Sequence, residues 1–237
     1  MGRRGKGGEI DFALVLHCVL RASLMEFYGK FETHFTIFLH REEDAEPLRQ
    51  WARDHAMKFL RIVLDRGVSA SQPMLTRYGR GTLAEERKAA EDYCLSLVAA
   101  GFSVVRVKIE VASENCGVPE TDADATSHSC DRYFEHHIKL LLEPADDAQS
   151  LAEIAEGHAA HLSRNTLRVR SDNRREQFLT QRCFRVGRVE AQRRLSLLLD
   201  ALAPFAHPIL EIEAEYVVYD SNLALDAGWI QQEGEPQ

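Results

Sequence analysis

Apolar and polar residues alternate in two stretches that closely resemble each other. FETHFTIFL begins at Phe31 and YFEHHIKLLL begins at Tyr133, and in each a Phe, a Glu, one further residue and a His precede an apolar run. Because successive side chains of a strand point to opposite faces, this alternation predicts two half-buried strands. The apolar residues share one face, and the Glu and the His share the other.

The similarity continues beyond these two strands. A shift of 103 residues aligns residues 31–61 with 134–164 without a gap, and 11 of the 31 positions are identical. One extra residue brings Leu75 and Thr76 onto Leu179 and Thr180, and the shift of 103 then returns, with Glu110 on Glu213. A match kept in register over this length indicates an internal duplication. A period near 100 residues is too long for a solenoid, so each copy is expected to be a small domain or half-domain.

Both copies predict the same order of elements. In the first copy the patterns predict strands at 31–39, 60–65, 73–78 and 102–111 and helices at 44–61 and 83–100. In the second copy they predict strands at 133–143, 165–171, 176–184 and 208–219 and helices at 147–162 and 187–203. The order is β-α-β-β-α-β, the ferredoxin-like unit. Leu95, Val98 and Ala99 are expected on the inner face of the helix at 83–100.

These elements predict an α+β fold, a tandem duplication of a ferredoxin-like βαββαβ unit. The two units are expected to form one pseudo-two-fold body with antiparallel sheets and a central cleft or barrel. The expected segments are an N-terminal extension (1–24), repeat 1 (25–111), an acidic polar linker loop (112–130), repeat 2 (131–222) and a C-terminal tail (223–237). The extension reads as a helix, a disordered segment or an over-extended start ahead of Met25.

The polar faces of the duplicated strands define the candidate site. In a ferredoxin-like unit the first and last strands are neighbours, so their polar faces should gather on one surface. In repeat 1 that surface carries Glu32, His34, Lys108 and Glu110. In repeat 2 it carries Glu135, His137, Lys139, Glu211 and Glu213. A pseudo-two-fold arrangement would bring both surfaces to one cavity.

Carboxylates beside imidazoles can bind a divalent metal or act as general acid and base. We therefore predict His34 and His137 as catalytic residues and Glu32, Glu110, Glu135 and Glu213 as metal ligands, with Mg²⁺ or Mn²⁺ as the expected metal and no organic cofactor. The alternative is a solvated strand face with cross-strand ion pairs. Retention of both residue types in both copies weakens that alternative and leaves it open, because a solvated face does not require those residue types. A further alternative is that these residues stabilise the contact between the two halves.

A run rich in arginine points to an anionic ligand. Ten Arg residues and only three acidic residues occur between Arg164 and Arg194. Guanidinium groups suit phosphate and carboxylate oxygens. We predict Lys108, Lys139, Arg168, Arg170 and Arg182 as substrate-binding residues. The alternative is a solvated hairpin, or arginines paired with the many glutamates.

Composition limits the partners. The net charge of −8 disfavours bulk binding of nucleic acid, and the apolar run at 10–20 is too short to span a membrane. Five Cys without tight spacing indicate reduced thiols and a cytoplasmic protein. A zinc site formed by Cys116, His128 and Cys130 is disfavoured, because it lacks a fourth ligand at suitable spacing. An oligomer is possible.

Two families share short motifs with this chain. His34-Phe-Thr36 resembles the His-x-Thr/Ser strands of the 2H phosphoesterases, although His137-Ile-Lys139 lacks the hydroxyl. Glu135-x-His137-x-Lys139, the stretch LRVRS…FLTQR and Glu211-x-Glu213 resemble motifs of the CYTH, or triphosphate-tunnel, enzymes, although a His replaces the middle Glu. Both resemblances imply chemistry on phosphate esters or anhydrides.

The resulting hypothesis is an enzyme that acts on a phosphorylated or nucleotide-like anionic substrate, by metal-assisted hydrolysis of a phosphoanhydride or phosphodiester in a cleft between the repeats. The rival hypothesis is a non-enzymatic ligand-binding or scaffold protein that uses the same cleft or sheet face. Whether the chain is an enzyme is left open by the sequence.

Overall fold

A computed structural model describes residues 27–146, 148–167 and 170–229. Repeat 1 contains β1 (Tyr28–Phe38), α2 (Ala45–Asp54), β2 (Lys58–Leu64), β3 (Ser71–Thr82), α3 (Leu83–Ala99) and β4 (Ser103–Ala112). Repeat 2 contains β5 (Tyr133–Leu142), α5 (Ala148–Gly157), β6 (Ala160–Asn165), β7 (Arg175–Phe184), α6 (Arg188–Leu202) and β8 (Ile209–Asp220). The chain is therefore an α+β tandem duplication of a ferredoxin-like unit, as predicted. The expected helix or extended start at 1–24 lies outside the described residues.

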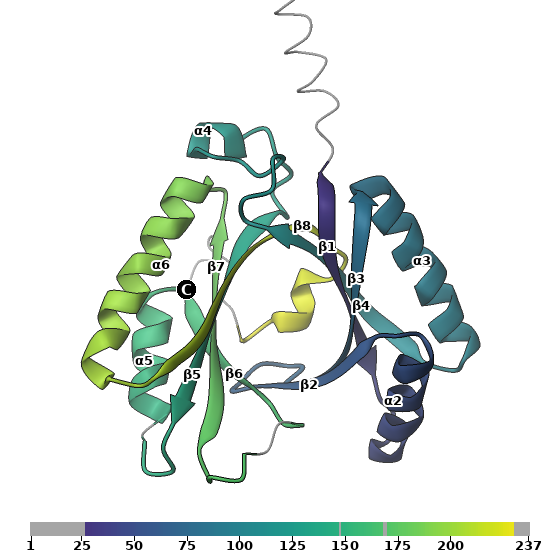
Figure 1. Cartoon of the computed structure of the whole chain (residues 1–237), viewed down its shortest axis with the longest axis horizontal. Coiled ribbons are helices and arrows are strands. Elements are labelled where there is room, and N and C mark those ends of the chain that lie inside the picture. Colours follow the sequence, from purple (N-terminus) through teal and green to yellow (C-terminus); the bar gives the residue numbers. More distant parts are fainter. Residues whose placement is uncertain (1–26, 147, 168–169, 230–237) are drawn as a thin grey trace, which may run out of the picture.

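The eight strands close into one barrel. Their order around it is β1-β3-β2-β6-β7-β5-β8-β4, and all neighbouring pairs are antiparallel. Within each repeat the first and last strands are neighbours, as predicted. The repeats join along two seams, β2 with β6 and β4 with β8. Of the alternatives left open by the sequence, a cleft or a closed barrel, the chain forms the barrel (Figure 1).

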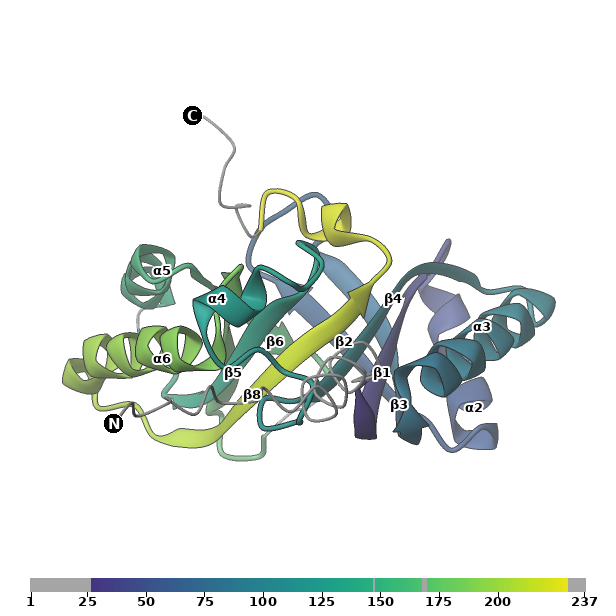
Figure 2. The same cartoon turned by 90° about the horizontal axis from the view of Figure 1, so that it is seen from above.

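Helices cover the outside of the ring. α2 and α3 pack on repeat 1, and α5 and α6 pack on repeat 2, so that the strands lie between two pairs of helices (Figure 2). Each layer between helices and sheet is apolar. Phe31, Phe35 and Ile37 of β1 are buried in the first layer, and Ile138 and Leu140 of β5 are buried in the second. The other parity of each strand faces the inside of the barrel.

The first helix of each repeat is shorter than predicted. α2 ends at Asp54 and α5 ends at Gly157, whereas the apolar spacing extended them to 61 and 162. Ala56 and Ala159, which are equivalent in the duplication, both have φ of 54° and so lie in the left-handed region. A left-handed residue just beyond a helix ends it. The chain can then start β2 and β6 early, and β6 occupies 160–165 rather than 165–171.

The predicted inner face of α3 is wrong. The helix buries Leu83, Ala90 and Leu97, together with the carboxylate of Glu86. Leu95 and Val98 are 70% and 61% exposed. Glu86 is retained inside because Thr33 donates to it at 2.7 Å and Arg77 forms an ion pair with it. Because these partners lie on β1 and β3, the helix packs with the face that carries Glu86 toward the sheet.

Two short segments complete the fold. The linker between β4 and β5 contains α4 (Asp122–Ala125), which begins at the capping residue Thr121. After β8, a 3-10 turn over Leu223–Asp226 leads the chain back into the barrel, and Trp229 is buried beside Leu64. Residues 223–229 of the predicted C-terminal tail therefore contribute to the interior of the barrel. No helix among the described residues has the length and apolar character needed to cross a membrane.

Candidate functional site in the barrel lumen

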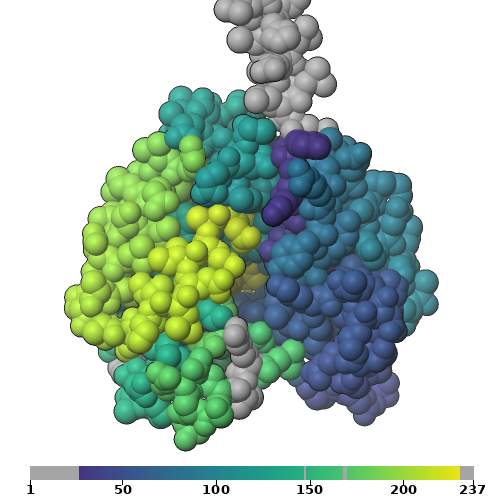
Figure 3. All heavy atoms as spheres, in the orientation of Figure 1, coloured from purple at the N-terminus to yellow at the C-terminus, as the bar shows by residue number. Residues whose placement is uncertain are grey.

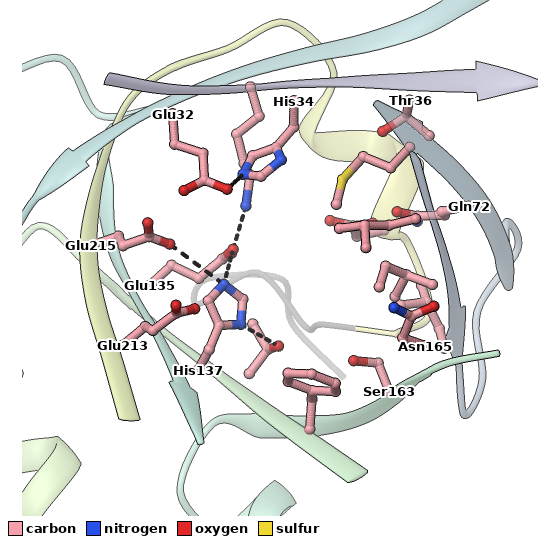
Figure 4. Close-up of a pocket in the computed structure, with 18 of the residues that line it drawn as sticks. Glu32, His34, Thr36, Gln72, Glu135, His137, Ser163, Asn165, Glu213 and Glu215 are labelled. Carbon is pink, nitrogen blue, oxygen red and sulfur yellow. Dashed lines mark hydrogen bonds and ion pairs between the residues drawn. The ribbon is translucent and has the colours of Figure 1, made fainter. Parts of the chain in front are cut away.

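The inside of the barrel is a cavity of about 300 Å³. The molecule is hollowed between its two repeats (Figure 3), and side chains from both repeats converge on the cavity (Figure 4). Glu32 and His34 enter from β1, and Glu135 and His137 enter from β5. The alternation along these strands therefore placed the duplicated Glu and His residues correctly.

Each lumen histidine is fixed at both ring nitrogens. His34 Nδ1 lies 2.9 Å from the Thr76 hydroxyl, and His34 Nε2 lies 2.6 Å from Glu110. A carboxylate accepts only, so Nε2 carries the proton and donates to it. In repeat 2, His137 Nδ1 lies 3.1 Å from Thr180, the residue equivalent to Thr76. The hydroxyl partner is therefore conserved between the two repeats.

The carboxylate partner of the histidine differs between the repeats. His137 Nε2 lies 3.1 Å from Glu135 on its own strand, whereas His34 binds Glu110 on the neighbouring strand. Glu213, the residue equivalent to Glu110, makes no hydrogen bond or ion pair with any residue in the described ranges. Equivalent residues of the two repeats thus lie in the lumen but have different hydrogen-bond partners.

A buried network of ion pairs joins the repeats. The Lys108 ammonium lies 2.7 Å from Glu110 and also contacts Glu135. Arg182 donates to Glu135 and, at 2.8 Å, to Asp226. Burial alone would raise the pKa of Glu135, but Arg182 and Lys108 hold it well below its usual range. Burial opposes the charge of Glu110 in the same way, and Lys108 and His34 lower its pKa to about 2.

Arg106 anchors the same network at the end of the lumen closed by the C-terminal turn. Its guanidinium donates to Asp220 at 2.9 Å and to Asp226 at 2.7 Å. Gln72 donates to Asp226 at 2.8 Å, and the indole of Trp229 donates to the Leu162 carbonyl at 2.9 Å. The segment over residues 221–229 therefore closes this end of the barrel, and its Asp226 pairs with both Arg106 and Arg182.

Three other carboxylates form an acidic cluster: Glu32, Glu213 and Glu215. His34 lies 3.8 Å from Glu32, and His137 lies 3.8 Å from Glu215. Burial, together with the neighbouring charge of Glu110, raises the pKa of Glu215 to about 10. Burial also raises the pKa of Glu32. The cluster is short of positive charge, because the lysine and arginines nearby are paired elsewhere.

The lumen has a charged half and a neutral half. The charged residues lie mainly on the contiguous strands β1, β4, β8 and β5. The strands β3, β2, β6 and β7 carry mostly uncharged lining residues: Leu60, Ile62, Leu64, Gln72, Met74, Tyr78, Ser163, Asn165, Phe178 and Thr180. Figure 4 shows Glu32, Glu213 and Glu215 on one side of the cavity and Gln72, Ser163 and Asn165 on the other.

The predicted anion-binding residues do not form a cationic site. Lys108 and Arg182 reach the lumen, but buried carboxylates neutralise both. Lys139 lies 3.3 Å from Glu176 and 3.7 Å from Glu211. Arg170 is paired with Asp172 and Glu176 at the turn before β7 and does not line the lumen. Arg168 lies outside the described residues.

Only some of the predicted metal ligands lie close together. Donor atoms of Glu110, Glu135 and His137 lie within 4.8 Å of one another. The Lys108 ammonium contacts both carboxylates and so already supplies a positive charge at that point. Glu32 and Glu213 belong to the separate acidic cluster. The catalytic and metal-binding roles assigned to these residues stay predictions.

Sequence reasoning missed the residues that lie far apart along the chain. Asp226 and Trp229 fall in the segment taken as a tail, and Arg106 was not distinguished from other strand residues. Glu215 continues the alternation of Glu211 and Glu213, so the same pattern could have identified it. The neutral half comes from β3, β2, β6 and β7. Which side chains of these strands face the lumen follows only from the closure of the barrel.

Comparisons with known proteins find similarity of fold only. No family model and no curated protein matches the chain. A mutant chlorite dismutase from Candidatus Nitrospira defluvii has 13% identity and a TM-score of 0.28, and the match covers 83% of this chain and 94% of that one. Another mutant of that enzyme has 15% identity and a TM-score of 0.28, with 87% and 96% covered. A dye-decolorizing protein from V. cholerae has 8% identity and a TM-score of 0.26, with 83% and 96% covered.

These findings correct the expectations about family and chemistry. The similar structures are chlorite dismutases and a dye-decolorizing protein, so the resemblance to CYTH enzymes and 2H phosphoesterases is wrong. The expected phosphate hydrolase is wrong as well. The ion pairs give a physical reason, since the cations expected to hold phosphate are neutralised within the protein. At such low identities and TM-scores, the likeness says nothing about what this chain binds.

The expectation of no organic cofactor conflicts with these comparisons, since the similar structures are heme proteins. The lumen of this chain does not fit heme. Both nitrogens of His34 and of His137 already have protein partners, so neither is free to ligate iron. Glu213 and Glu32 would also repel the carboxylates of a heme.

Proposed function

We propose that the protein binds a small organic cation in the barrel lumen. The positively charged group would lie among Glu32, Glu213 and Glu215, and the organic body would lie against the neutral half. The observation that carries this proposal is the acidic cluster, which has no full counter-charge, facing an uncharged wall across a cavity of about 300 Å³.

The charge balance favours a cation over an anion. Six acidic residues and four lysines or arginines line the lumen: Glu32, Glu135, Glu211, Glu213, Glu215 and Asp226, against Lys58, Arg106, Lys108 and Arg182. Three of the four cations are tied to buried carboxylates, and Lys58 donates to Tyr78. An anion would meet uncompensated carboxylates, whereas a cation would relieve their repulsion.

The neutral half favours an organic ligand over a bare ion. Leu60, Ile62, Met74 and Phe178 are only partly buried and border the cavity. Apolar lining with a few convergent charged groups is typical of small-molecule sites. Phe178 could also contact the cation through its ring face, as it does Lys139, whose ammonium lies 5.6 Å from the ring centre.

A matched set of three ligands tests the proposal. Phenethylamine, 2-phenylethanol and 3-phenylpropanoate share an aromatic body and differ in the charge at the end of the chain. We expect the amine to bind by titration calorimetry and to raise Tm. At a hundredfold excess over Kd the stabilisation is about 2.7 kcal/mol, or roughly 5–10 °C for a chain of this size. The alcohol and the carboxylate should bind at least tenfold more weakly.

Isosteric variants locate the site. Glu213→Gln should weaken binding of the amine, while Glu91→Gln on the exposed surface of α3 should leave it unchanged. Equal binding of the alcohol, or tighter binding of the carboxylate, contradicts the proposal. The proposal includes a cytoplasmic location, which is supported by the four Cys without disulfides among the described residues. A catalytic role for His34 and His137 stays a prediction.

A further inference from the structure

Three lumen carboxylates follow one another along β8. Glu211, Glu213 and Glu215 occupy alternate positions and line the cavity from the same face of the strand. Alternate residues of an extended strand are separated by roughly 6.8 Å, so the row spans roughly 13–14 Å. The register places Glu215 opposite Glu135 and Glu211 opposite Lys139 on β5. The row therefore extends along the lumen in one direction.

Exposure falls along this row from the mouth of the lumen to its interior. The Glu211 side chain is 53% exposed, and the Glu215 side chain is 19% exposed. Glu213, between them, has no hydrogen bond or ion pair within the described part of the chain. Three lysines act on the row: Lys139 lies 3.7 Å from Glu211, Lys58 acts on Glu213 over a longer distance, and Lys108 acts on Glu215 but is paired with Glu110 and Glu135. The row therefore presents three carboxyl groups at a regular spacing.

A ligand that matches this row needs positive charges at a similar spacing. Two ammonium groups separated by four or five methylenes lie about as far apart as two alternate strand residues, roughly 6.8 Å. The methylenes between them need an uncharged surface, and the neutral half supplies one opposite the row. A single ammonium would use only one position of the three.

We propose that the lumen takes a linear diamine or polyamine, with successive ammonium groups at Glu215, Glu213 and Glu211 and the methylenes against the neutral half. This inference rests on the proposed binding of an organic cation and narrows its ligand class. The interior ammonium is held by Glu215 together with Glu32, and the outermost by the more exposed Glu211. Affinity should therefore rise with each added ammonium at the right spacing.

Two comparisons by titration calorimetry test the spacing. 1,5-Diaminopentane and n-hexylamine have the same number of heavy atoms and differ by one charge, and we expect the diamine to bind at least tenfold more tightly. 1,2-Diaminoethane, whose ammonium groups are too close for two positions of the row, should lose this advantage. Spermidine, with three amines, should bind more tightly than 1,5-diaminopentane.

The variant Glu211→Gln connects the third position to the structure. It should reduce the ratio of spermidine affinity to n-hexylamine affinity at least threefold, whereas Glu91→Gln should leave the ratio as it is. If n-hexylamine binds as tightly as 1,5-diaminopentane, the second ammonium does not contact the row. The polyamine inference then fails, and the proposed binding of an organic cation still holds. If no amine binds, both proposals fail. If polyamines bind equally well to wild type, Glu211→Gln and Glu215→Gln, they adhere to the acidic surface and the inference is overturned.

Discussion

Arg182 Nη2 lies 2.8 Å from Asp226 Oδ2, and the same guanidinium donates to Glu135. One side chain therefore connects the C-terminal turn with the carboxylate that holds His137. All three ionised groups are buried. Removal of the shared cation would leave two carboxylates without their main partner in a low-dielectric interior.

We expect Arg182→Ala to lower the free energy of unfolding by about 3–5 kcal/mol, the usual cost of breaking a buried ion pair. Urea unfolding monitored by circular dichroism measures this change. Arg188→Ala, which removes the exposed pair with Glu120, is the matched control and should have a much smaller effect. Similar losses in the two variants would show that the buried network does not stabilise the barrel.

Glu215 should make stability depend on pH. Its folded-state pKa is raised to about 10, whereas an unperturbed glutamate titrates near 4.5. Between these values the folded state binds more protons, so its stability is fully present below the unfolded pKa and is lost as pH rises toward 10. The groups that act on Glu215 are Glu32, Lys108, Glu110 and Glu135. Each pH unit costs at most about 1.4 kcal/mol from this group.

The variant Glu215→Gln cannot ionise and should flatten this dependence. We expect wild type and variant to have similar Tm values at pH 5, and the variant to be the more stable at pH 9. Thermal unfolding at four or five pH values measures the difference. A difference that does not change with pH would place the Glu215 carboxyl in an ordinary aqueous environment.

Binding of an amine at pH 7.5 should release a proton. Glu215 is protonated at that pH because its pKa is about 10, and a cation beside it favours the ionised form. The apparent binding enthalpy in calorimetry should therefore differ between phosphate and Tris buffers, with a slope that corresponds to about one proton. Glu215→Gln should bind the amine without this buffer dependence. Equal slopes in the two proteins would assign the proton to another group.

Ala56 and Ala159 should be sites of stabilising substitution. Each has φ of 54°, where a Cβ costs about 1–2 kcal/mol and glycine has no such penalty. The greater freedom of glycine in the unfolded chain offsets part of this gain. We expect Ala56→Gly and Ala159→Gly each to raise the free energy of unfolding by about 0.5–1 kcal/mol. Ala89→Gly, inside α3, should lower it by about 1 kcal/mol.

Local patterns sufficed for the fold because each strand must bury one parity. A shift of one residue in β1 would send Phe31 and Phe35 into the lumen and Glu32 and His34 into the apolar layer, so the alternation fixes the orientation. The internal duplication then supplied the topology. The face of α3 could not be obtained in this way, because Glu86 is buried through partners on two other strands.

The charge of the site depended on contacts that no local pattern contains. Arg182 and Lys108 suggested an anion site, but Glu135 and Asp226 neutralise them from positions distant in the chain. Glu215 has the same residue type as Glu110, yet its pKa is raised and that of Glu110 is lowered, because Lys108 and His34 lie against Glu110. The sequence shows which groups reach the lumen, and only the full arrangement shows which remain unpaired.

The two seams of the barrel have a consequence for its origin. A single repeat would leave β2 and β4 as open edges, and these are the strands that meet β6 and β8 in the complete chain. Two identical subunits could close the same ring, with every residue present twice. Fusion into one polypeptide removed that constraint, so that Lys108 could diverge from its counterpart Glu211, and Tyr78 from Arg182. Covalent linkage thus allowed a symmetric architecture to enclose an asymmetric interior.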